Sequence, residues 1–285
     1  MNIEDTVAVV TGGASGIGLG ISAALAKHGA RVIIADIDVD RARVEADRLN
    51  ERGLRAHGAG LDVTRRASWS ALAKRAQRIG PVDILCNNAG VGGGRDRIDE
   101  YAAERWRWVN AVNVTGPLLG IQTFLPSMKT RGEPAHIVNT VSMLGIVATP
   151  NTVGYIATKF AAMGICLNLR QELHGTQIHV SALCPGMVRT RIVETSSKLA
   201  PGSRPPADAA AVEAMNAVMA GGMDPFAVGE RVCRAINQGD FYIFTHPEWR
   251  FLVERHYAEM LTAFGESADP GHRDNVEAIA GAQPS

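Results

Sequence analysis

The feature that most constrains the fold is the opening segment, in which a short apolar run meets a glycine-rich loop and then a helical pattern. The run is VAVVT at residues 7–11, the loop is GGASGIG at residues 12–18, and LGISAALAKHGA follows. Gly12, Gly16 and Gly18 allow a tight turn and a close approach to a pyrophosphate, whose charge is favoured at a helix N-terminus. An ordinary glycine-rich turn is the alternative, so the loop needs support from the rest of the chain.

Short β-branched runs alternate with longer helical patterns, which is typical of βαβ units and a parallel sheet. The near-continuous apolar character of several runs suits strands covered on both faces. We expect an α/β fold with a single doubly wound, parallel, seven-stranded sheet and helices on both faces, within residues 1–245. The expected strands are Val7–Thr11, Arg31–Asp36, Arg55–Leu61, Asp83–Asn87, His136–Ser142, His179–Cys184 and Phe241–Phe244.

Composition excludes several kinds of partner. Lysine plus arginine and aspartate plus glutamate number 29 each, so no net field recruits nucleic acid or an anionic membrane. The cysteines are widely spaced without a CxxC pair, which favours free thiols in a reducing compartment over a disulfide frame or a metal site. No apolar run approaches the ~20 residues of a membrane span, and the N-terminus lacks a signal-like segment. We therefore expect a soluble, cytoplasmic protein that binds no nucleic acid, membrane or metal.

Asp36 ends the second expected strand and bears on the choice of cofactor. A carboxylate at this place can accept hydrogen bonds from both hydroxyls of an adenosine ribose, and it would repel a 2′-phosphate. No lysine or arginine precedes Gly16 or directly follows Asp36 to reverse that preference. The pattern favours NAD over NADP.

Three residues with complementary chemistry lie in the stretch SMLGIVATPNTVGYIATK at 142–159. Tyr155 and Lys159 are four residues apart, so they share one face of a helix. An ammonium beside a phenol lowers the phenol pKa from its usual ~10, which lets tyrosine exchange a proton with an alcohol or carbonyl. Ser142 can hold the substrate oxygen against Tyr155. A Tyr-x-x-x-Lys pair alone is common on helices, so the serine and the glycine loop are what make it informative.

Together these motifs resemble the short-chain dehydrogenase/reductase family over residues 3–245. The resemblance implies that Ser142, Tyr155 and Lys159 are catalytic and that Asn113, in the segment NVTG, holds a water for proton relay. It also implies contacts to NAD from several motifs in family order. The residues concerned are Gly12, Ser15, Gly16, Ile17, Gly18, Asp36, Asp62, Val63, Asn88, Ala89, Gly90, Tyr155, Lys159, Pro185, Gly186, Val188 and Thr190.

The reaction implied by the resemblance is hydride transfer between NAD and a secondary alcohol or ketone. The expected substrate contacts are Ser142, Met143, Leu144, Tyr155 and Met187. Most are apolar, and Arg95 in the glycine run is the nearest cation, so an uncharged hydrophobic substrate is favoured over a phosphorylated or CoA-linked one. A weaker similarity to dehydrogenases of benzylic secondary alcohols makes an aromatic substrate one option, beside steroid-like and aliphatic alcohols.

Two other classes of function are open. An NAD-dependent epimerase or dehydratase acting on a nucleotide sugar would need a sugar-nucleotide domain, for which the remaining chain is short. A non-catalytic NAD-binding sensor or scaffold would keep the glycine loop and Asp36, but it would have no reason to combine Ser142, Tyr155 and Lys159. Fold resemblance cannot separate these classes, whereas the site can.

Three further segments carry predictions about assembly and access. The helix YIATKFAAMGICLNL at 155–169 is apolar nearly all round, so we expect burial against the sheet and against another subunit of a homo-oligomer, a dimer or tetramer. Burial beneath the C-terminal segment is the alternative. Residues 191–225 are proline-rich and suit a mobile substrate lid, although a helix packed permanently on the body fits as well. Residues 246–285 are expected to form a helical extension and a polar tail.

Overall fold

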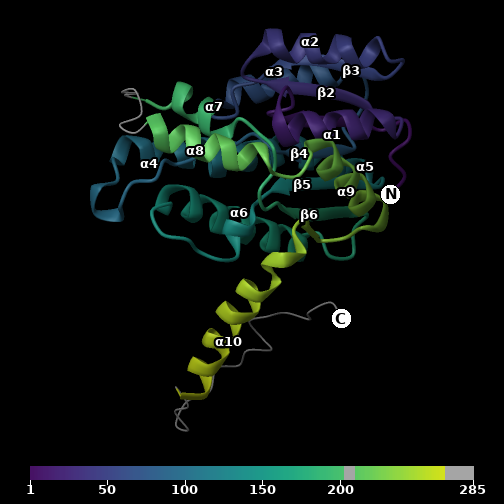
Figure 1. Cartoon of the computed structure of the whole chain (residues 1–285). Coiled ribbons are helices and arrows are strands. Elements are labelled where there is room, and N and C mark those ends of the chain that lie inside the picture. Colours follow the sequence, from purple (N-terminus) through teal and green to yellow (C-terminus); the bar gives the residue numbers. More distant parts are fainter. Residues whose placement is uncertain (202–208, 267–285) are drawn as a thin grey trace. The chain divides into compact units, whose positions relative to one another are not determined.

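The structure, a computed structural model, describes residues 1–201 and 209–266. Strands and helices alternate along most of the chain, with short 3-10 or π-helical segments (η) between some of them (Figure 1). In chain order the elements are β1 (Val7–Thr11), α1 (Gly16–Lys27), β2 (Arg31–Asp36), α2 (Val39–Asn50), β3 (Arg55–Gly60), α3 (Arg66–Ala76), β4 (Ile84–Asn87), η1 (Ile98–Glu100), α4 (Ala103–Asn110), η2 (Ala111–Thr115), α5 (Gly116–Arg131), β5 (Ala135–Thr140), η3 (Met143–Gly145), α6 (Val153–Glu172), β6 (Ile178–Cys184), α7 (Ile192–Leu199), α8 (Ala209–Ala220), α9 (Pro225–Gln238), β7 (Tyr242–Phe244), η4 (Pro247–Trp249) and α10 (Arg250–Glu266).

The described residues contain a seven-stranded sheet with the order β3-β2-β1-β4-β5-β6-β7, in which every pairing is parallel. The apolar runs form strands that are covered on both sides, and β1 is buried at every position. The order reverses at β1, which pairs with β2 on one side and with β4 on the other. In open α/β sheets ligands bind at such a reversal, in the crevice at the carboxyl ends of the strands. The doubly wound α/β fold predicted from the sequence is confirmed.

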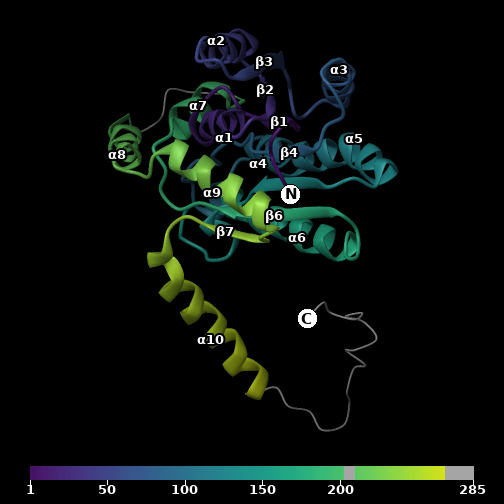
Figure 2. The same cartoon turned by 90° about the vertical axis from the view of Figure 1, so that its right-hand side faces the viewer.

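Helices cover both faces of the sheet. Helices α1, α2 and α9 pack on one face and α3, α5 and α6 on the other, to the left and right of the strands in Figure 2. The first face is filled by side chains such as Ile21, Leu25 and Val232. The second contains Trp69 and Phe124, whose rings meet edge to face with centroids 6.3 Å apart. Removal of these apolar surfaces from water is the main force that holds the layers together.

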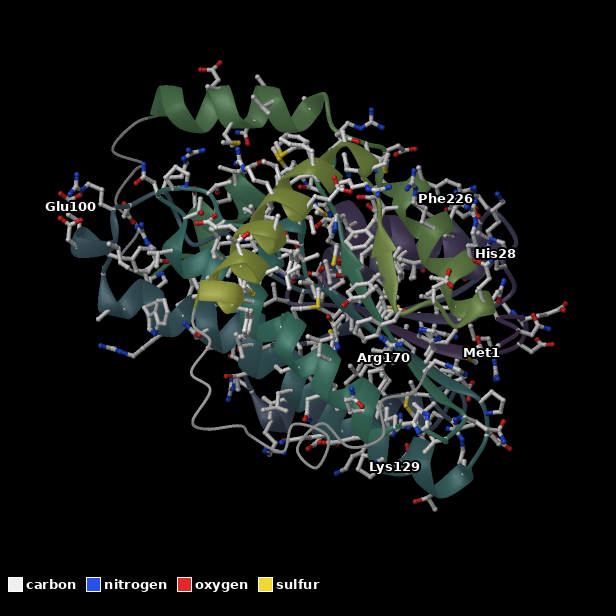
Figure 3. The ribbon with its side chains drawn as sticks, turned by 90° about the horizontal axis from the view of Figure 1, so that it is seen from below. Met1, His28, Glu100, Lys129, Arg170 and Phe226 are labelled. Atoms are coloured by element: carbon white, nitrogen blue, oxygen red, sulfur yellow. The ribbon has the colours of Figure 1, made fainter. Side chains whose placement is uncertain are left out.

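Helices α1 and α9 approach so closely that each needs a glycine at the contact. A Cβ on Gly20 would lie 2.1 Å from the Pro225 carbonyl oxygen, and one on Gly229 would lie 2.2 Å from the Gly20 carbonyl oxygen. At the end of α1, His28 Nε2 lies 2.8 Å from a Glu230 carboxylate oxygen, and His28 is labelled in Figure 3. The helix that follows the glycine loop is thereby fixed to the helix that follows the expected lid.

The strands lie where the sequence predicts them, to within two residues at either end. The largest difference concerns β5, which ends at Thr140 and not at Ser142. Val141 still donates its backbone N–H to the Leu183 carbonyl at 2.7 Å, but at Ser142 the chain turns into η3. Ser142 therefore leaves the sheet and lies in the loop at its carboxyl edge.

The chain divides into two compact units, Met1–His246 and Pro247–Ser285. The described part of the second unit consists of η4 and α10, at the place where the sequence predicts a helical extension. The predicted polar tail lies outside the described residues, as do residues 202–208 of the expected lid. The rest of that segment contains α7 and α8, drawn in green in Figure 1. Its mobility stays a prediction.

The described residues contain neither a membrane-spanning helix nor a disulfide bond. No described helix is both long and apolar enough to cross a membrane. Cys86, Cys166, Cys184 and Cys233 are buried and unpaired, as the sequence predicts. Burial raises the pKa of these thiols, to about 11 for Cys166 and about 12 for Cys184. They therefore act as small apolar groups of the core.

We expect Gly20→Ala to lower the free energy of unfolding of the ligand-free protein by at least ~2 kcal/mol, because an added methyl group meets the backbone of α9. Urea denaturation measures the change. Gly221→Ala is the matched control, since its Cβ would meet nothing closer than the Val218 carbonyl oxygen at 3.6 Å. Equal stability of the two variants would contradict the close approach of α1 and α9.

Candidate active site

The residues that the sequence singles out come together at the carboxyl edge of the sheet. The glycine loop follows β1, the turn NNAG begins at the end of β4, Ser142 follows β5 and the turn PGMVRT follows β6. Tyr155 and Lys159 lie in the first turns of α6. Because the strands are parallel, these segments border one crevice although they are far apart in the chain.

The loop after β1 has no room for side chains at its glycines. A Cβ on Gly12 would lie 2.9 Å from the Ala89 Cα, and one on Gly18 would lie 2.1 Å from the Gly12 carbonyl oxygen. Gly12 and Gly16 have positive φ angles of 60° and 50°, which favour glycine. This cradle at the N-terminus of α1 fits the phosphates of a dinucleotide, since its N–H groups and the helix dipole favour negative charge. The half-buried residues of the loop are Gly12, Ser15, Gly16 and Ile17.

Asp36 lies at the end of β2, beside that loop. Its Oδ2 accepts the Ala14 N–H at 3.0 Å, and its Oδ1 accepts the Asp38 N–H at 3.1 Å. Burial raises the pKa of the carboxyl group above its ordinary value, and the two backbone hydrogen bonds oppose that shift. The carboxylate is thus oriented, and each oxygen keeps a lone pair for a further donor such as a hydroxyl group.

The turn after β4 is bonded directly to the end of β1. The Thr11 hydroxyl oxygen accepts the N–H groups of Asn88 and Ala89, each at 2.9 Å, and Asn88 Nδ2 donates to the Thr11 carbonyl at 3.0 Å. At Gly90 a Cβ would lie 3.8 Å from Lys159 Nζ. Thr11 was not predicted as a site residue, because a threonine at a strand end carries no signal until the neighbouring strand is known.

Asp62 and Val63 follow β3 at the same edge of the sheet. Asp62 Oδ1 accepts the backbone N–H of Thr64 at 2.9 Å and its hydroxyl group at 2.7 Å. Val63 is buried, and its carbonyl accepts Trp69 Nε1–H at 2.9 Å. These bonds order the loop to which the family resemblance assigns cofactor contacts, and the contacts themselves stay predictions.

The serine, tyrosine and lysine singled out by the sequence lie together where β5 ends and α6 begins. The Ser142 hydroxyl lies beside the Tyr155 phenol and favours its ionised form, and it accepts the Leu144 N–H at 3.1 Å. Lys159 Nζ lies 5.4 Å from the centre of the Tyr155 ring and donates to the Thr140 carbonyl at 2.8 Å. Tyr155 is half-buried and Lys159 is buried. The catalytic roles of these side chains stay predictions.

Burial dominates the ionisation of these groups. It raises the pKa of Tyr155 above its ordinary value, against the opposing effect of the Ser142 hydroxyl. It lowers the pKa of Lys159 to about 8. The sequence predicts a lowered pKa for Tyr155, and the structure gives the opposite direction. The reason is that desolvation of the phenol outweighs other influences, while Lys159 directs its hydrogen bond to Thr140.

Asn113 lies in η2, a π-helical segment between α4 and α5, and such segments are frequent at functional sites. Its Oδ1 accepts the Val91 N–H at 2.9 Å, and its Nδ2 donates to the Val91 carbonyl at 2.9 Å and to Thr158 Oγ1 at 3.1 Å. The side chain therefore fastens the segment after NNAG to α6, next to Lys159. Since both amide hydrogens are used, a relay water would have to bind an oxygen of Asn113.

The PGMVRT turn joins the site from β6. The Pro185 carbonyl accepts the Met143 N–H at 3.0 Å, next to Ser142. Val188 is buried, and Thr190 lies against the glycine loop, since a Cβ on Gly16 would be 3.0 Å from Thr190 Cγ2. One turn thus touches both the serine loop and the cradle.

The expected substrate contacts differ in accessibility. Met143 is 2% exposed, whereas Leu144 and Met187 are half-buried. The chain turns directly after Ser142, so that Met143 packs inward and Leu144 keeps accessible surface. Met143 therefore supports the serine loop and offers little surface to a ligand.

The glycine run after NNAG is held from two sides by residues that the sequence motifs do not predict. Gly92 donates its N–H to Ser196 Oγ on α7 at 2.7 Å, and Tyr101 donates its hydroxyl to the Gly93 carbonyl at 2.6 Å. A Cβ on Gly93 would lie 2.8 Å from the Tyr155 nitrogen, so the run passes close to the first turn of α6. Neither contact has a sequence signal, because its partners are distant in the chain or lack a motif.

Comparisons with known proteins agree with this arrangement. Residues 6–200 match the family model for short chain dehydrogenases. The chain is similar to a 1-deoxy-11-beta-hydroxypentalenate dehydrogenase of Streptomyces exfoliatus, with 34% identity over 262 residues that cover 91% of this chain and 90% of the relative. It is also similar to a C alpha-dehydrogenase of Sphingobium sp. strain SYK-6, with 28% identity over 287 residues that cover 98% of this chain and 93% of the relative.

Among solved structures, the chain is similar to a short chain dehydrogenase/reductase from Burkholderia phymatum in complex with NAD. The TM-score is 0.86 and the identity 32%, covering 96% of this chain and 99% of the other. The resemblance carried by the sequence motifs is confirmed by these similarities. Because the family model spans more than half of its length, the chain belongs to the short-chain dehydrogenase/reductase family of oxidoreductases.

Proposed function

We propose that the protein is an NAD-dependent, cytoplasmic alcohol dehydrogenase or ketone reductase that acts on a hydrophobic secondary alcohol or ketone. The observation that carries the proposal is the meeting of Ser142, Tyr155 and Lys159 at the edge of the sheet where the glycine loop also lies. Four buried, unpaired thiols suit a reducing compartment.

The residues present fit a nicotinamide dinucleotide. The glycine cradle at the start of α1 would hold the phosphates, Asp36 would accept from the ribose hydroxyls, and Val188 and Thr190 would meet the nicotinamide carboxamide. When bound, the cofactor supplies the acceptor or donor of hydride. The related structure from Burkholderia phymatum, which contains NAD, supports this choice.

Tyr155 is the residue that exchanges a proton with the substrate oxygen in this proposal. Its hydroxyl gives a proton to a carbonyl oxygen, and its phenolate takes the proton of an alcohol. Ser142 lies beside the same phenol, so it can bind the same substrate oxygen and stabilise the charge that develops there. Lys159, with Nζ 5.4 Å from the ring centre, stabilises the phenolate when it forms. Because burial raises the pKa of Tyr155, its resting form is the phenol.

The surroundings of Ser142 favour an uncharged, hydrophobic substrate. Leu144 and Met187 are half-buried and apolar, while Arg95 is exposed. The relative from Streptomyces exfoliatus acts, by its name, on a compound with a hydroxyl group. An aromatic, benzylic alcohol is the specific class that we propose, with steroid-like and aliphatic alcohols as the alternatives.

We expect Tyr155→Phe to reduce turnover by at least ~10²-fold, because the phenyl ring cannot exchange a proton. NAD binding should stay within about twofold, since no hydrogen bond of the glycine cradle is lost. Initial rates of nicotinamide reduction over a panel of benzylic, steroid-like and aliphatic secondary alcohols, with calorimetry for binding, measure both. Tyr257→Phe, at an exposed tyrosine of α10, is the control. Loss of binding together with turnover would indicate a structural role for Tyr155, and binding without turnover by the unaltered protein would favour a sensor.

The cofactor preference tests Asp36 separately. We expect the unaltered protein to bind NADH more tightly than NADPH, and Asp36→Asn to reduce that preference by about tenfold, because a repulsive charge is removed. The positive charge of Arg41 lowers the pKa of Asp36, and it would also attract a 2′-phosphate. Fluorescence titration with both nucleotides gives the affinities, and Asp40→Asn, an exposed carboxylate on α2, is the control. Tighter binding of NADPH by the unaltered protein would show that the cofactor assignment is wrong.

A homo-oligomer is the second part of the proposal. One side of α6 packs on the sheet, but Phe160 and Leu167 on its other side are 41% and 42% exposed, and Leu118 on α5 is 40% exposed. An apolar groove runs between α5 and α6 from Leu118 to the level of Lys129, which is labelled in Figure 3. Within Met1–His246 this face stays open to solvent, and the family resemblance assigns it to a second subunit.

We expect the double variant Phe160→Glu, Leu167→Glu to be monomeric where the unaltered protein is a dimer or tetramer, because charged groups cannot be buried at an apolar contact. Sedimentation velocity measures the molecular mass. Val44→Glu, an equally exposed apolar residue on α2, should leave the assembly intact. A monomeric unaltered protein, or an oligomeric double variant, would contradict the proposed interface.

A further inference from the structure

The end of β7 lies beside the turn that follows β6. The two strands are parallel, with Cys184 opposite Phe244, so two residues further on Gly186 faces His246. Thr245 is fully buried and His246 is half-buried. Neither residue has a role in the reaction described above, and both belong to the unit Met1–His246.

His246 bonds to the turn through both ring nitrogens. Gly186 donates its N–H to Nδ1 at 3.1 Å, and Nε2 lies 2.9 Å from the Met187 carbonyl oxygen. An amide N–H can only donate and a carbonyl oxygen can only accept, so Nδ1 carries no hydrogen and Nε2 carries one. The Thr245 hydroxyl, 2.6 Å from Nδ1, is then a second donor to that nitrogen. The surroundings therefore select one neutral tautomer of His246.

The same turn is tied to the rest of the site. The Met187 carbonyl also accepts the Met223 N–H at 2.9 Å, and the Pro185 carbonyl accepts the Met143 N–H at 3.0 Å. Gly222 must be a glycine here, because its Cβ would lie 2.8 Å from the Met187 carbonyl oxygen. The imidazole thus completes a set of bonds that fixes the orientation of two peptide groups of the turn, Pro185–Gly186 and Met187–Val188.

We propose that His246 is a positioning residue that holds the PGMVRT turn in the conformation that receives the nicotinamide half of the cofactor. The inference rests on the proposed function, in which Val188 and Thr190 meet the carboxamide. Without the imidazole, the Gly186 N–H keeps only its longer contact to Thr245 Oγ1 at 3.3 Å, and the Met187 peptide group loses one of its two donors. His246 itself does not touch substrate or cofactor in this proposal.

The test compares two nucleotides that differ in the nicotinamide half alone. NADH and ADP-ribose are titrated into the full-length protein and into His246→Ala, with calorimetric detection. We expect His246→Ala to weaken NADH binding about tenfold, because two hydrogen bonds to the turn are lost, and to leave ADP-ribose binding unchanged. His174→Ala, an exposed histidine between α6 and β6, should change neither.

Two further variants separate the two ring nitrogens. His246→Asn can retain an acceptor near the position of Nδ1, and His246→Gln can retain a donor near that of Nε2. Each should lose less NADH affinity than His246→Ala. If the alanine variant does not fold, these two variants replace it in the test. Nitrogen NMR of protein labelled at histidine, assigned with His246→Gln, should show the hydrogen on Nε2.

Three outcomes would overturn the inference. They are equal loss of NADH and ADP-ribose affinity, no loss of either, and a hydrogen on Nδ1 of the neutral ring. Failure of the proposed function gives a different result, since the unaltered protein would then bind neither NADH nor NADPH. In that case the protein would have no cofactor site, and the inference about His246 would fail with the proposed function.

Discussion

The contact between the loop after β1 and the turn after β4 is the constraint on which the rest of the site depends. Gly12 has no room for a Cβ because Ala89 lies against it, and the Thr11 hydroxyl accepts the N–H groups of both Asn88 and Ala89. β1 and β4 are neighbours at the reversal of strand order, so this contact lies where the ligand-binding crevice of such a sheet forms. A side chain at Gly12 would displace the cradle and the turn together.

Burial then decides the chemistry that the crevice can support. The packing of α6 on the sheet removes Lys159 from water and leaves Tyr155 half-buried. Desolvation raises the tyrosine pKa and lowers that of the lysine to about 8. Both shifts favour the neutral forms, and a pKa of about 8 still leaves Lys159 mostly charged at neutral pH. The two ionisations are therefore sensitive to what occupies the site.

Several side chains bond to the backbone of the loops that surround the site. Asn113 fastens the segment at Val91, Ser196 and Tyr101 hold the glycine run, and His246 bonds to the PGMVRT turn. Each of these hydrogen bonds satisfies a backbone group of an irregular segment that would otherwise bond to water. Loops of this kind can hold catalytic groups in place because their peptide groups are bonded on more than one side.

The sequence by itself determined the doubly wound fold and the strands to within two residues, because β-branched runs and glycine turns are local signals. It also singled out Ser142, Tyr155 and Lys159, since helical spacing alone puts the last two on one face. The tertiary structure decided that the Tyr155 pKa rises, that Met143 is buried and that His246 meets Gly186. Desolvation and contacts between distant residues depend on how the elements pack, and no local pattern encodes that packing.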